Sequence, residues 1–147
     1  MTKATARLDS GYKTVIQVRN HTLIADEPVS DGGTDAGPSA KEYLLVALGA
    51  CATITMKMYA ERKKWPLEGI EIDLSTERYK TVDYPAFLGD GDFVHEFRQR
   101  IVIKGALSEE QKQRLLEIAG KCPVHRVLTE PSFMIETLVD SLIAEEA

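Results

Sequence analysis

Residues 37–65 read GPSAKEYLLVALGACATITMKMYAERKKW and predict one long helix with a cysteine near its middle. Ser39 and Glu42 have the spacing of a capping box, in which each side chain pairs with a backbone N–H that the first helical turn leaves free. Residues 61–64 return the helix to water, and the cations among them suit the negative end of the helix dipole. Pro66 ends the helix, because a proline disfavours helical geometry in the residue before it.

The middle of this helix is apolar on nearly all sides. From Tyr43 to Ala60 the residues are apolar or small, apart from Thr53, Thr55 and Lys57. Such a helix is buried on nearly all sides. We therefore expect a sheet to pack against one side and another element, such as a partner subunit, to pack against the other. A membrane span is the alternative, but it needs about 20 strongly apolar residues, and the polar and small residues of this run interrupt it. We therefore expect a central helix and no membrane insertion.

The composition narrows the class of protein. With 147 residues, 44% of them hydrophobic, the chain is expected to form one globular domain, 1–147, with a substantial core. The net charge of −5 and the lack of a basic block argue against a nucleic-acid partner. The first ten residues contain no apolar segment, so no signal peptide is expected, and the cytoplasm is the expected location. Two cysteines and three scattered histidines lack zinc spacing, and no metal or cofactor is predicted.

The remaining pattern alternates strands with helices, which predicts an α+β fold. Ser108 and Gln111 form a second capping box, and Gly120 suits a left-handed cap at the end of that helix. Cys122 is expected to be the N-cap, and Pro123 a first-turn residue, of a short third helix. Alternating apolar residues predict strands at 5–8, 12–18, 22–25, 70–75, 94–104 and 133–139.

Two cysteines, Cys51 and Cys122, are the candidates for chemistry. A free cysteine is most often a small buried hydrophobe, and Cys51 in the middle of a helix fits that interpretation. Cys122 differs because a thiol at a helix N-terminus faces unpaired N–H groups, which favour the thiolate. His125 and Arg126, one turn later, add to this effect. From the residues alone, Cys122 is the better candidate for a lowered pKa.

Cys51 needs a cation from elsewhere in the fold if it is to be reactive. Arg19, Arg98 and Arg100 are available, and the sequence does not choose among them. Glu42 already has a role in the capping box. It also stands nine residues before Cys51, so the two side chains leave opposite faces of the helix. Any help that Glu42 gives to a thiol is therefore expected through a bridging arginine or across subunits.

Two cysteine motifs carry a resemblance to a known family. Residues 42–51 (EYLLVALGAC) and 122–126 (CPVHR) resemble the OsmC/Ohr family of thiol-dependent peroxidases. The segments HTLIADEP at 21–28, GGTDAGPS at 32–39 and MYAERKKWPLE at 58–68 are similar to its OsmC-like branch. The resemblance implies antiparallel sheets packed on a long central helix, in an intertwined homodimer whose two central helices pack together between the sheets.

The resemblance also implies a reaction. Cys51 attacks the peroxide and becomes a sulfenic acid, Cys122 resolves it as a disulfide, and an external dithiol reduces the pair. Glu42 orients an arginine that stabilises the attacking thiolate, and Arg19 is the candidate. Apolar residues around Cys51 favour an organic hydroperoxide, with hydrogen peroxide as a further substrate, and no metal, haem or flavin is involved. Two alternatives remain open: a non-catalytic dimer that binds a small apolar ligand, and a cysteine redox sensor.

Overall fold

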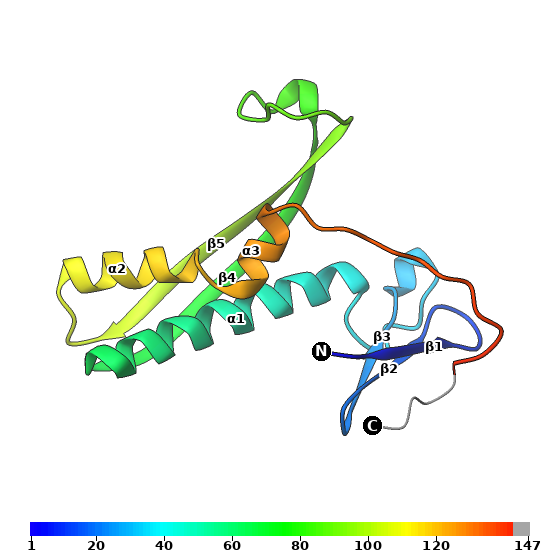
Figure 1. Cartoon of the computed structure of the whole chain (residues 1–147), viewed down its shortest axis with the longest axis horizontal. Helices are drawn as coiled ribbons and strands as arrows, with labels where there is room; N and C mark the ends of the chain where they lie inside the picture. Colours follow the sequence, from blue (N-terminus) through cyan, green and yellow to red (C-terminus); the bar gives the residue numbers. More distant parts are fainter. Residues whose placement is uncertain (143–147) are drawn as a thin grey trace.

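The structure, a computed structural model, describes residues 1–142 and has the α+β architecture that the sequence predicts. One long helix, α1, lies along a ribbon of two long strands, with α2 and α3 packed beside it and a small sheet near its N-terminal end (Figure 1). The elements are β1 (Thr5–Leu8), β2 (Thr14–Val18), β3 (His21–Ala25), a 3-10 turn (Val29–Asp31), α1 (Ala40–Lys63), β4 (Leu67–Lys80), a second 3-10 turn (Thr81–Asp83), β5 (Phe93–Gly105), α2 (Glu109–Ala119) and α3 (Pro123–Thr129).

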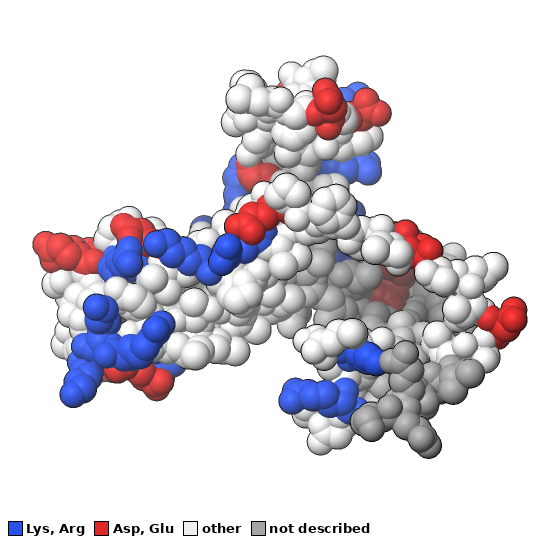
Figure 2. Space-filling view, viewed as in Figure 1, with Lys and Arg blue, Asp and Glu red and all other residues white. Residues whose placement is uncertain are grey.

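Helix α1 begins and ends where its sequence predicts. The backbone N–H of Ser39 donates to Glu42 Oε2 at 2.7 Å, and the N–H of Glu42 donates to Ser39 Oγ at 3.4 Å, which completes the capping box. At the other end Lys64 adopts a left-handed conformation with φ of 55°. Arg62 and Lys63 occupy the last turn, where blue side chains gather at the left of Figure 2 and complement the negative end of the dipole.

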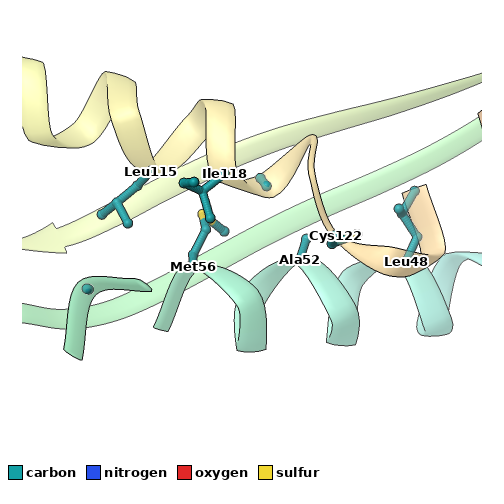
Figure 3. Close-up of a cluster of buried hydrophobic side chains, with 8 residues drawn as sticks. Leu48, Ala52, Met56, Leu115, Ile118 and Cys122 are labelled. Atoms are coloured by element: carbon teal, nitrogen blue, oxygen red, sulfur yellow. The ribbon is translucent and has the colours of Figure 1, made fainter. Parts of the chain in front are cut away.

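One face of α1 forms the core. Its buried residues recur about once per turn, and they meet side chains of α2 (Figure 3). Both helices rest on the inner face of the ribbon, because residues of β4 and β5 pack against the same cluster. The cluster consists of Leu48, Ala52, Met56, Ala60, Leu115, Ile118, Ala119 and Cys122.

The opposite face of α1 is not covered by residues 1–142. Val46, Ile54 and Met58 are 55%, 59% and 58% exposed. The helix was predicted to be buried on two sides, and within residues 1–142 this chain buries one of them. By length and composition α1 is also able to cross a membrane, a property that it shares with core helices of soluble proteins. Its packing against β4 and α2 is that of a core helix.

The long ribbon is antiparallel and two-faced, as its alternating pattern predicts. Ile70 pairs with Ile103 and Ile72 with Ile101, and these side chains face the core. The outer face carries cross-strand ion pairs, such as the one between Asp73 and Arg100. Both strands extend beyond their predicted ends, and residues 81–92 join them.

Asp26 holds the segment that leads from the small sheet into α1. It is 3% exposed and accepts hydrogen bonds from the backbone N–H groups of Glu27, Thr34 and Ala36 and from the Thr34 hydroxyl. A carboxylate that accepts several hydrogen bonds is stabilised in its charged form. These bonds, led by that from the Thr34 hydroxyl, lower the pKa of Asp26 from 3.8 to about 2. The turn is therefore tied together by a carboxylate that the sequence pattern identifies only as a loop residue.

Two local predictions are wrong. Residues 133–139 alternate like a strand, but they form no regular secondary structure, and Phe133 and Ile135 are both 91% exposed. A strand exists only where a neighbouring strand takes its backbone hydrogen bonds, and none lies beside this segment within residues 1–142. Gly120, expected in a left-handed conformation, has φ of −70° and remains right-handed.

Candidate functional site

Cys122 is the N-cap of α3, as predicted, and it lies inside the core. Its Sγ accepts a hydrogen bond from the backbone N–H of His125 at 3.3 Å, and Pro123 follows it in the first turn. The side chain is 0% exposed. It lies over α1 at the level of Ala52 and Leu48 (Figure 3).

Cys51 approaches the same point from α1. It is partly exposed, and its side chain packs against the buried cluster that contains Cys122. The two thiols are neighbours, because Cys51 is one of the groups that raise the pKa of Cys122. Both cysteines are free thiols. The fold therefore brings together two sulfur atoms that are far apart in the chain, one of them reachable from solvent and the other enclosed.

The pKa of Cys122 shifts in the direction opposite to the sequence prediction. Burial raises it above the ordinary value of 9.0, because an apolar surrounding disfavours the charged thiolate. The N–H groups of His125 and Val124 lower the pKa, and the neighbouring Cys51 thiol raises it further. The prediction of a lowered pKa, based on the helix N-terminus with His125 and Arg126, is wrong because the burial of the thiol outweighs these effects.

Glu42 and Arg19 lie away from this pair of thiols. Glu42 is exposed and engaged in its capping box, and Arg19 is exposed in the turn between β2 and β3, with a left-handed φ of 54°. Within residues 1–142, no hydrogen bond or ion pair joins Arg19 to Glu42 or to Cys51. Arg98 and Arg100, the other candidate cations, pair with acidic side chains of the ribbon.

The part of the chain that the structure describes contains no group of three or more His, Cys, Asp or Glu residues arranged to hold a metal ion. The two thiols and the polar groups around them are the groups with potential for chemistry at this place. One such group, the amide of Gln99, does not stand out in the sequence pattern. Gln99 points inward from β5, and its Oε1 is buried without a hydrogen-bond partner. Its inward register in the alternating strand was the only sequence signal.

The architecture matches one family. The family model described as OsmC-like protein matches residues 32–137, and the chain belongs to this family. A comparison with curated proteins finds no match.

Solved structures share the fold at low identity. An OsmC-like protein from Mycoplasma pneumoniae is 21% identical, with a TM-score of 0.72 over 88% of this chain and 87% of that one. An organic hydroperoxide resistance protein from Legionella pneumophila is 18% identical, with a TM-score of 0.64 and coverage of 87% and 88%. The organic hydroperoxide resistance protein OhrB of Bacillus subtilis is 20% identical, with a TM-score of 0.60 and coverage of 86% and 89%.

Proposed function

We propose that this protein is a cytoplasmic, cysteine-based peroxidase that reduces organic hydroperoxides and also accepts hydrogen peroxide. The observation that carries the proposal is the proximity of a partly exposed Cys51 to a fully buried Cys122. Family membership supports it, as do the names of the relatives from Legionella pneumophila and Bacillus subtilis, both of which are organic hydroperoxide resistance proteins.

The proposed reaction has three steps. The Cys51 thiolate attacks the terminal oxygen of R–O–OH, the O–O bond breaks, and the departing alkoxide takes a proton and leaves as the alcohol. Cys51 is then a sulfenic acid, and the Cys122 sulfur displaces its hydroxyl group, which leaves as water when the disulfide forms. An external dithiol reduces the disulfide by two successive thiol–disulfide exchanges and is itself oxidised.

The different surroundings of the two thiols support this division of roles. The attacking thiol must be reached by the peroxide, and only Cys51 of the pair is exposed to solvent. The thiolate is the nucleophile in such chemistry, and burial raises the pKa of Cys122, which makes it a poor first attacker. Once Cys51 is oxidised, the next step takes place within the pair, and the enclosed Cys122 lies close to the sulfur that it attacks.

We propose that two copies of the chain associate through the uncovered face of α1 and so form a homodimer. Val46, Ile54 and Met58 present a row of exposed apolar side chains on that face, and apolar surface of this kind favours association. In this assembly Glu42 orients Arg19, and the guanidinium stabilises the Cys51 thiolate.

Consumption of cumene hydroperoxide in the presence of a dithiol tests the proposal. The wild-type protein is expected to turn over, and Cys51→Ser is expected to lose activity entirely. After oxidation, mass spectrometry without reductant is expected to show the bond between Cys51 and Cys122. Equal rates for the wild type and Cys51→Ser would refute the enzyme, and oxidation limited to a single turnover would instead favour a redox sensor.

Two arginine variants test the proposed cation. Arg19→Ala is expected to lower the rate of peroxide consumption, whereas Arg7→Ala, an exposed arginine of the same small sheet, is expected to leave it unchanged. Equal rates for both variants and the wild type would exclude Arg19 from the site.

A further inference from the structure

A cavity of about 730 Å³ lies between the N-terminal half of α1, α3 and the far half of the β4–β5 ribbon. Sites for small organic molecules fall in this range of volume. The cavity adjoins the thiol pair, because His125 lines it while its backbone N–H donates to Cys122 Sγ. Leu48, which belongs to the same buried cluster as Cys122, forms part of its wall.

The walls of this cavity are mainly apolar and aromatic. Charged side chains are also present, but Lys41 and Arg78 are matched by Glu77 and Glu96. Arg78 already lies 4.5 Å from the centre of the Phe93 ring. A balanced lining of this kind favours an uncharged ligand. The apolar surface comes from Leu44, Leu48, Phe87, Phe93, Phe97 and Leu128.

Gln99 is the polar group that this cavity leaves unsatisfied. Its side chain lines the cavity, and its Oε1 is buried without a hydrogen-bond partner among residues 1–142. A buried polar atom without a partner is destabilising, and it calls for an explanation. Rotation of the terminal amide exchanges its oxygen and nitrogen ends, so Gln99 can turn an acceptor or a donor toward a ligand. A hydroxyl group satisfies both.

We infer that Gln99 orients ligands in this cavity by a hydrogen bond with the hydroperoxy group of the substrate or the hydroxyl group of its alcohol product. The ligand class is an uncharged molecule with an aromatic or branched apolar body and one O–H group. The identity of the ligand rests on the proposed function, but binding to the cavity does not, and it is measurable without turnover.

A pair of probes with nearly the same shape tests the inference. Cumyl alcohol carries a hydroxyl where tert-butylbenzene carries a methyl, so the ratio of their dissociation constants reports the hydrogen bond. Both are titrated into full-length Cys51→Ser protein and into Cys51→Ser with Gln99→Leu. Loss of the Gln99 partner is expected to shift the ratio against the alcohol by roughly tenfold. The matched control, Gln113→Leu on the exposed side of α2, is expected to leave the ratio unchanged.

A second measurement keeps Gln99 in place. In the NMR spectrum of Cys51→Ser, cumyl alcohol is expected to shift the side-chain amide signals that disappear in Gln99→Leu. An unchanged ratio in Gln99→Leu, alcohol binding without movement of those signals, or no binding of either probe up to its solubility would each overturn the inference. If the wild-type protein still consumes cumene hydroperoxide when one of these results is obtained, the proposed peroxidase activity is retained and only the role of Gln99 in the cavity is refuted. Binding through Gln99 without turnover refutes the peroxidase alone.

Discussion

The core between α1 and α2 is tested by shortening one of its buried leucines. Leu115 is 0% exposed and lies in the cluster that encloses Cys122, whereas Leu116, its neighbour on α2, is 46% exposed. Replacing Leu115 by Ala removes an isopropyl group from the core, which costs about 2.4 kcal/mol at ~0.8 kcal/mol per carbon. The remaining cavity adds about 1 kcal/mol, for a loss of about 3 kcal/mol in the free energy of unfolding.

Leu116→Ala is the matched control, since the change in side chain and in helix propensity is the same. It is expected to cost less than about 1 kcal/mol. Urea unfolding followed by the fluorescence of Trp65, the single tryptophan, measures both variants at one protein concentration. The loss for Leu115→Ala corresponds to a fall in Tm of about 6–12 °C. Equal losses for the two variants, or a loss below about 1 kcal/mol for Leu115→Ala, would refute this description of the core.

Three further predictions concern pH and backbone geometry. Hydrogen bonds, led by that of Thr34, hold the pKa of Asp26 at about 2, so its contribution to stability is present above pH 3.8 and is lost as the pH falls through about 2. The urea midpoint of Asp26→Asn is expected to lose this dependence on acidic pH. A midpoint that falls with acid as steeply as that of the wild type would contradict the prediction. The raised pKa of Cys122 has the opposite sign, so its contribution is complete below pH 9.0 and declines as the pH rises through the raised value. In reducing buffer, the urea midpoint of Cys122→Ala is expected to decline less at alkaline pH than that of the wild type. An equally steep decline would argue against this prediction. Gly105→Ala places a Cβ 2.2 Å from a carbonyl oxygen at a φ of +135°, whereas Gly91 has a similar φ of +125° in open space. Gly91→Ala therefore reports backbone strain alone, of about 1–3 kcal/mol. Gly105→Ala adds the steric clash and should lower the urea midpoint further. Equal midpoints for the two variants would exclude the clash.

Patterns of neighbouring residues predicted the helices well. Ser39 with Glu42 and Ser108 with Gln111 form the capping boxes that their spacing indicates, and Cys122 is an N-cap. In each case the partners are within one helical turn, so the local backbone alone brings them together. The alternation in β4 and β5 was equally informative, because side chains of successive strand residues point to opposite faces.

Predictions that depend on distant parts of the chain fared less well. Residues 133–139 carry a strand pattern, but the pattern cannot supply the neighbouring strand. A left-handed cap was expected at Gly120, but α2 ends there in a right-handed conformation, whereas α1 ends with a left-handed residue at Lys64. Arg19 was one of several cations that the sequence left equivalent, and its role remains a prediction.

The sequence by itself determined the α+β class, the limits of α1 and the place of each cysteine on its helix, since these follow from hydrogen bonds and side-chain directions over a few residues. Only the tertiary structure decided the surroundings of the thiols. Packing α3 onto α1 brings Cys122 close to Cys51 and encloses it. That burial reverses the direction of the pKa shift, because removal of water from a thiol depends on every element that surrounds it.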